Sequence, residues 1–119
     1  MWDVFNSKNL LKKCSCPALL AGVLAINPIT VQALTAEDIL NKMSAKEQTA
    51  FVSGVVGAFA QVRWMRERPD QTGSNCIYNW FYGDKNKKTW KRIDAWFSRH
   101  PEKPAVPLLY VLIKKECGE

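Results

Sequence analysis

Apolar residues recur at the three- and four-residue spacing of an α-helix along most of the chain after residue 34. The longest such stretch is Ala45–Arg66, and its wide apolar face predicts the central and most buried helix. Ser44 followed by Glu47 is a capping-box pattern that marks where this helix begins. Gly54 and Gly57 lower the helix propensity of this segment. Glycines inside a helix are typical of positions where a neighbouring helix approaches closely. The expected core positions are Phe51, Val52, Val55, Val56, Ala58, Phe59, Val62 and Met65.

Shorter helices are expected on either side of this long one. Thr35, with acidic residues in the turn after it, predicts a short first helix. The residues expected to face the core from it are Ile39, Leu40 and Met43. Asn75–Tyr82 fits a helix capped by Ser74 or a strand, and helix is preferred because no second strand with clean alternation is evident.

Two further amphipathic segments complete the predicted domain. Thr89–Ser98 carries apolar residues at helical spacing, and a last helix is expected to begin near Pro104 and to end at Cys117. The expected inward residues of these two helices are Trp90, Ile93, Trp96, Phe97, Val106, Leu109, Leu112 and Ile113. Polar turns are predicted at 67–73 and 83–88. The pattern therefore predicts an all-α fold, a compact bundle of four to five short helices.

The first 33 residues have the pattern of a secretory signal peptide. Lys8, Lys12 and Lys13 precede a short apolar run at 18–26, and Val31-Gln32-Ala33 supplies the small residues that a signal peptidase reads. The run is too short for the ~20 residues of a membrane-spanning helix. We therefore expect a signal peptide at 1–33, a single helical domain at 34–119, a periplasmic location, and no membrane span after removal of the leader.

Two cysteines remain in the expected mature domain of 86 residues, Cys76 and Cys117. Cysteines in a small exported domain usually pair, and a bridge over 41 residues contributes roughly 4 kcal/mol in the chain-entropy model. The alternatives are free thiols or a metal site, and the metal is disfavoured because no His or Cys lies near either residue at ligand spacing. The sequence therefore predicts one disulfide, Cys76–Cys117.

Charge narrows the class of partner. The expected mature domain carries a net charge near +4. This charge favours weak attraction to anionic surfaces, such as peptidoglycan, lipid headgroups or an acidic protein patch. It is too small, in an exported protein, to indicate nucleic-acid binding.

The sequence offers no recognisable catalytic chemistry. The one histidine, His100, lies in a proline-flanked turn after a helix, where it is expected to cap the helix end or lie on the surface. The chain contains no HExxH pattern, glycine-rich phosphate loop or carboxylate cluster. We therefore expect a protein that is not an enzyme and that binds neither a cofactor nor a metal. The alternative is a small helical enzyme whose active site has no recognisable sequence motif.

Three consecutive aromatic residues, Trp80, Phe81 and Tyr82, span most of a helix circumference, so at least one is expected at the surface. They lie next to the basic turn after them, and the 66–73 loop is basic as well. Such cationic and aromatic mixtures suit an acidic protein partner. The expected partner-binding residues are Arg66, Arg68, Trp80, Tyr82, Lys85, Lys87 and Lys88. The alternative is that the basic residues merely face solvent in the turns, and that the aromatic residues pack against the predicted helix that contains Trp90.

Several segments resemble those of a known family. They are the acidic-capped start at 34–40, Phe51-Val52-Ser53-Gly54-Val55-Val56-Gly57-Ala58, Cys76-Ile77, the Trp96–Ala105 stretch, and a closing apolar helix that ends in Cys117. Together they resemble the type VI secretion immunity proteins of the Rap/Tai kind, over nearly all of the expected mature chain. The family often has Pro where this chain has Tyr78, and the segment around Arg63 is unusually charged.

The resemblance implies a small exported helical protein that neutralises a peptidoglycan-cleaving toxin by plugging it. It also implies a protein toxin or another envelope protein as partner, and some relatives are homodimers. No binding residue of the family can be carried over, because toxin recognition lies in variable loops. The alternatives are a periplasmic stress chaperone of the HdeA kind, or another small helical envelope protein. HdeA-like chaperones have a cysteine early in the mature chain, whereas this chain has none between residue 34 and Cys76.

Overall fold

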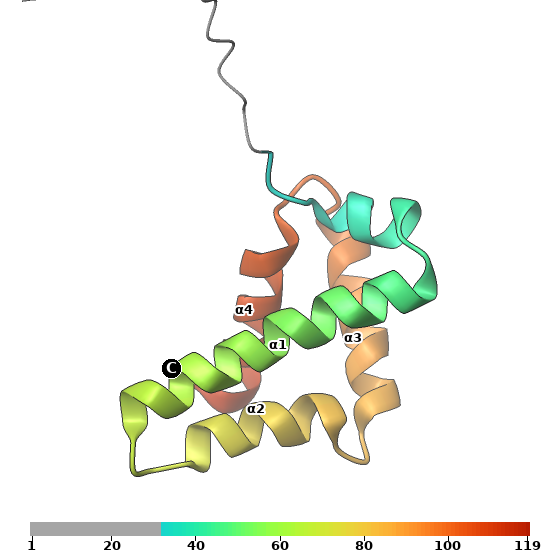
Figure 1. The fold of residues 1–119 in the computed structure, drawn as a ribbon. Helices are drawn as coiled ribbons and strands as arrows, with labels where there is room; N and C mark the ends of the chain where they lie inside the picture. Colours follow the sequence, from blue (N-terminus) through green and yellow to red (C-terminus); the bar gives the residue numbers. More distant parts are fainter. Residues whose placement is uncertain (1–31) are drawn as a thin grey trace, which may run out of the picture. The chain divides into compact units, whose positions relative to one another are not determined.

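The helical pattern of the sequence is realised in the computed structural model, which describes residues 32–119 (Figure 1). The elements are the π-helix η2 (Asp38–Lys42) and the α-helices α1 (Ala45–Glu67), α2 (Thr72–Tyr82), α3 (Asn86–Arg99) and α4 (Ala105–Cys117). No strand forms in this part of the chain, where Thr35 and Pro104 make an isolated bridge. The predicted all-α fold is confirmed. The signal-peptide prediction concerns residues that lie almost entirely outside the described range.

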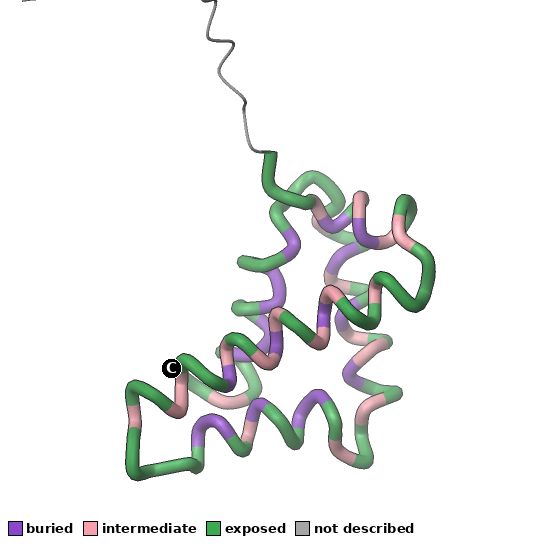
Figure 2. Tube along the Cα trace, in the orientation of Figure 1, coloured by how far each residue is buried: buried purple, intermediate pink, exposed green. Residues whose placement is uncertain are grey.

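The helices pack around one core. α1 and α2 run antiparallel, side by side, and form the most extensive helix pair, while α4 packs against α1, α2 and α3 (Figure 1). The buried residues lie on the inward side of each helix (Figure 2). The largest buried side chains are Phe81, Phe97, Ile39, Ile77, Ile93 and Leu109. None of the helices in residues 32–119 is both long and apolar enough to cross a membrane.

α1 begins where the sequence predicts but is less buried than expected. The capping box is present. The Ser44 hydroxyl accepts a hydrogen bond from the Glu47 amide, and the Glu47 carboxylate accepts one from the Ser44 amide. Only Val52, Val56 and Ala60 of this helix are buried. Val62 is 55% exposed and Met65 50% exposed, so the prediction of a most buried central helix is wrong. α2 and α4 cover one side of α1. Phe51, Val55 and Phe59 pack against the core while partly buried, and Ala58, Val62 and Met65 are exposed.

The glycines of α1 do not mark a close approach. A methyl group built on either Gly54 or Gly57 would meet nothing within 4 Å. The interpretation of these glycines as helix-packing positions is therefore wrong. Gly73, which the sequence places in a loop, is a tight position: a methyl group there would lie 2.5 Å from Arg63 Nε and 2.5 Å from Glu67 Oε2. Gly73 lets the start of α2 approach the end of α1.

α2 and α3 each begin three residues before the predicted start. At α2, the Asp70 carboxylate accepts the amide of Thr72 at 2.9 Å, which satisfies one of the free amides of the first turn. Ser74 is not a cap: it is buried inside the helix, and its hydroxyl donates to the Gln71 carbonyl. At α3, the Asn86 side chain donates to the Phe81 carbonyl, which fixes the helix start against the end of α2.

The N-terminal segment is tied to the loop between α3 and α4. The amides of Ala36 and Glu37 donate to the carbonyls of Lys103 and Pro101 at 2.9 and 3.0 Å. The Ala105 amide in turn donates to the Leu34 carbonyl at 2.9 Å. These bonds place Ile39, the buried residue of η2, in the core of the domain.

Thr35 caps the helical turn at residues 36–37 that leads into η2, as the sequence predicts. The Thr35 amide and hydroxyl both donate to the Asp38 carboxylate at 2.9 Å, and Thr35 Oγ1 accepts the Asp38 amide at 3.2 Å. The Lys42 ammonium contacts the other carboxylate oxygen. The hydrogen bond from Lys42 and the bonds from Thr35 lower the pKa of Asp38 from 3.8 to about 2.

We expect this group to make the stability of the domain fall with acid. The unfolded chain takes up the proton near pH 3.8, whereas the folded chain holds Asp38 ionised to about pH 2. The stabilisation is therefore complete above pH 4 and is lost as the pH falls towards 2. Thermal unfolding of the wild-type protein and of Asp38→Asn at several pH values checks this. The variant should melt lower at pH 7 and show a weaker pH dependence between 4 and 2. Parallel curves would contradict it.

Candidate functional site

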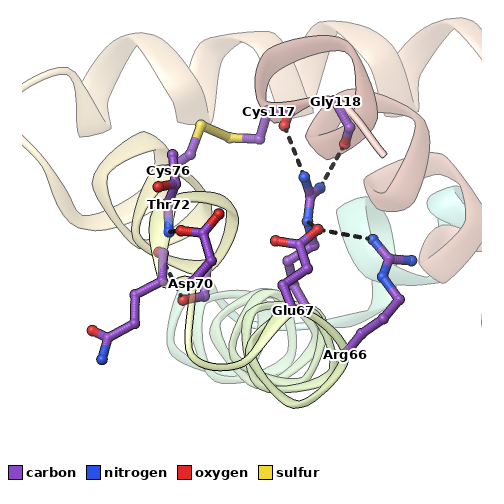
Figure 3. A network of polar contacts seen from close by, with 10 residues as sticks. Arg66, Glu67, Asp70, Thr72, Cys76, Cys117 and Gly118 are labelled. Carbon is purple, nitrogen blue, oxygen red and sulfur yellow. Dashed lines mark hydrogen bonds and ion pairs between the residues drawn. A yellow bond between two sulfur atoms is a disulfide. The ribbon is translucent and has the colours of Figure 1, made fainter.

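The predicted disulfide is present and joins α2 to the end of α4. The Cα atoms of Cys76 and Cys117 lie 5.7 Å apart, and the two sulfur atoms are bonded. Arg63 of α1 donates to the carbonyl oxygen of Gly118 at 2.8 Å and to that of Cys117 at 3.5 Å, and it pairs with Glu67 (Figure 3). A cation at these carbonyls stabilises the helix end. The disulfide and Arg63 therefore fasten the same end of α4 to two different helices.

A broad hollow of about 760 Å³ lies beside the disulfide. The end of α2, the α2–α3 turn and the first turns of α3 form it together with Glu116 of α4. Lys85, Lys88 and Arg92 supply positive charge, and Asp84 and Glu116 supply negative charge. Arg92 is held by an ion pair with Glu116, 2.9 Å from Nη1 to Oε2. Lys85 and Lys88 are exposed and form no ion pair within residues 32–119.

The structure separates the two loops that the sequence places on one binding face. Lys85 and Lys88 line the hollow at the C-terminal end of α2, and Lys87 is exposed beside them. Arg66 and Arg68 lie near the opposite, N-terminal end of α2 (Figure 1). This helix has 11 residues and is therefore about 16 Å long. Arg66 contacts Glu67, and the Arg68 guanidinium lies 5.1 Å from the centre of the Trp64 ring. The two groups are not one surface.

Trp80 is not the exposed anchor that the sequence indicates. It is only 7% exposed, and its backbone carbonyl accepts the Thr89 hydroxyl at 2.7 Å. Ile77, Trp80 and Phe81 share the inward side of α2 because they are three and four residues apart. Tyr82 lies outside this stripe and is 55% exposed, as expected for at least one of the three consecutive aromatic residues. Of the predicted aromatic contacts, Tyr82 alone is available to a partner.

Sequence reasoning missed Arg92 and Glu116, which meet only because α3 and α4 pack together. The available signal was the four-residue spacing of Lys88 and Arg92, which places both on one side of α3. His100 lies at the end of α3 as expected, and its ring packs against Trp96 with centroids 4.3 Å apart. Among the described residues, no three His, Cys, Asp or Glu side chains are grouped so that they could hold a metal ion.

The fold and the site define a small all-α domain closed by one disulfide, with a partly cationic hollow at the α2–α3 turn. Such a hollow can attract and hold negatively charged groups. Comparison of the chain with protein-family models, with curated proteins and with solved structures found no match.

Proposed function

We propose that this chain is a non-enzymatic partner-binding protein of the bacterial envelope, an immunity-type inhibitor of a peptidoglycan-cleaving toxin. Three features support the proposal. Its segments resemble the type VI immunity proteins of the Rap/Tai kind, its N-terminus has the pattern of a secretory leader, and its helical domain carries a disulfide of the sort that persists in an oxidising compartment. The proposed location is therefore the periplasm.

The observation that carries the proposal is the set of cations that the fold leaves unused. Lys85 and Lys88 project from the rim of the hollow into solvent and make no ion pair among residues 32–119. Tyr82, at the end of α2, is exposed next to the same turn. Exposed cations beside an aromatic side chain on a rigid helical scaffold are suited to binding a protein of complementary charge.

The test is direct inhibition of a cognate hydrolase. The gene neighbourhood is searched first for an envelope-directed hydrolase, and an enzyme found there is purified and assayed on peptidoglycan. We expect the oxidised protein to abolish hydrolysis at a one-to-one ratio and to leave an unrelated muramidase unaffected. Inhibition of both enzymes would indicate masking of the substrate, and inhibition of neither would contradict the proposed function.

A periplasmic acid-stress chaperone makes a different prediction. Such a chaperone loses its fold in mild acid and then binds unfolded clients. In this chain, hydrogen bonds lower the pKa values of Asp38, Glu47 and Asp70, so the stability that these carboxylates contribute is lost as the pH falls, which is the direction that a chaperone activated by acid requires. Suppression of client aggregation at pH 3, together with acid-induced exposure of apolar surface, would support the chaperone instead.

A further inference from the structure

A second hollow, of about 340 Å³, lies between α3 and α4. Its lining contains five cations and no carboxylate: Lys88, Lys91, Arg92, Arg99 and Lys115. Four of them, Lys88, Lys91, Arg92 and Arg99, lie on α3 at positions that the helical repeat brings to one side of the helix. Lys115 faces them from α4. The two helices thus place their basic side chains around a shared concave surface.

The fold does not neutralise these charges. Within residues 32–119, Arg92 alone of the five forms an ion pair, with Glu116. Lys88, Lys91, Arg99 and Lys115 are exposed. Like charges at such spacing repel one another and slightly destabilise the helix that carries them. A cluster of like charges that leaves four of its five cations without an ion pair among the described residues is expected where an anionic ligand supplies the missing charge.

An aromatic ring fixes two of the cations. The Arg99 guanidinium lies 5.6 Å from the centre of the Trp96 ring, and the Lys115 ammonium lies 5.0 Å from it. These cation–π contacts hold one cation from each helix at the same place. Because the side chains are already ordered, a ligand loses less free energy in immobilising them. Ala95 and Trp96 also line the hollow, so it offers hydrophobic contact together with charge.

We propose that this α3–α4 hollow binds an acidic, carboxylate-bearing segment of a protein partner. The inference rests on the proposed function and names the chemistry of the partner. Carboxylates pair with Lys and form two-pronged hydrogen bonds with Arg, and an extended acidic chain can follow the row of cations along α3. A concave site with an apolar floor favours a protruding segment over the flat surface of a membrane. The proposed contact lies apart from the Arg66 and Arg68 loop that the sequence indicated.

The test uses a fluorescent peptide of about ten glutamates and the full oxidised domain. In low salt we expect the triple variant Lys91→Glu, Arg99→Glu and Lys115→Glu to bind the peptide at least about tenfold more weakly than wild type. The matched control is Lys42→Glu, Lys46→Glu and Lys103→Glu, at three exposed lysines that line neither hollow. It changes the net charge equally and should keep peptide binding within about twofold of wild type. Equal losses in the two triple variants would show that net charge alone drives binding and would overturn the proposal.

Further measurements distinguish binding of an acidic protein segment from binding of a membrane or a polyanion. Glutamine at the same three positions serves if the glutamate variant fails to fold, and it should also weaken peptide binding. Binding of wild type to phosphatidylglycerol vesicles or to heparin, without binding to the glutamate peptide, would overturn the protein-partner assignment.

The hydrolase assay keeps the two proposals distinct. If the hollow variant inhibits the hydrolase as well as wild type does, the proposed function stands and the assignment of the hollow fails. If wild type does not inhibit, the proposed function fails whatever the peptide result.

Discussion

Replacing Cys76 and Cys117 together by serine is expected to lower the free energy of unfolding by about 2–5 kcal/mol. The bridge closes a loop of 41 residues and therefore restricts the unfolded chain. A domain of this size buries too little surface to absorb such a loss easily. Wild-type protein and the double variant, compared by urea unfolding, give the difference directly. The slope of the free energy with urea should also increase, because the unfolded variant exposes more surface.

The control is the wild-type protein unfolded in the presence of a reductant, which removes the bond without changing the side chains. Its free energy of unfolding should match that of the serine variant to within about 0.5 kcal/mol, because Cys76 and Cys117 are only partly buried. A difference of less than about 1 kcal/mol between oxidised and reduced wild type would contradict the prediction.

Gly83→Ala is expected to destabilise the domain by about 1–3 kcal/mol, whereas Gly54→Ala should stabilise it by about 0.5–1 kcal/mol. A methyl group on Gly83 would press against the backbone carbonyl of Asn79, which also accepts the Gly83 amide. Backbone cannot move aside as a side-chain tip can, so the end of α2 must shift. A methyl group on Gly54 meets nothing within 4 Å and gains the helix propensity of alanine.

The two variants are matched because each adds one methyl group. Chemical denaturation of both, compared with wild type, therefore separates the effect of where the methyl group lies from the effect of adding one. We also expect Gly83→Ala to alter the hollow at the α2–α3 turn, since Gly83 lines it. The interpretation of the two glycines fails if Gly83→Ala is neutral or if Gly54→Ala destabilises the protein.

Local sequence signals predict the elements of this fold well where the deciding interactions are local. The capping box at Ser44 and the Thr35–Asp38 pair give two correct starts because both partners lie within three residues of each other. α2 begins earlier than expected because Asp70, outside the helix, accepts a hydrogen bond from the amide of Thr72, and because Gly73 permits close contact with α1. The start of α3 likewise depends on a side-chain bond from Asn86 to the end of α2.

The candidate site was less predictable because it depends on which helices meet. The disulfide could be inferred because only two cysteines remain in the expected mature domain. The exposure of Tyr82 is consistent with the expectation that three consecutive aromatic residues cannot all face the core of a helical domain. The burial of Trp80 depends on its place in the stripe shared with Ile77 and Phe81, together with the packing of α2 on its neighbours. The charged hollow between α3 and α4 requires Lys115 to face Arg99 across Trp96, and no sequence spacing encodes that meeting.

The two ends of α4 are held by bonds of different kinds. The C-terminal end of α4 is held by the disulfide and by the Arg63 guanidinium. The N-terminal end of α4 and the loop before it are joined to the N-terminal segment by three backbone hydrogen bonds. We therefore expect transient local opening of the native domain to begin at this loop and not at the disulfide. The disulfide would keep α2 and α4 joined during such an opening. The domain can thus fluctuate at one pole without passing through its unfolded state.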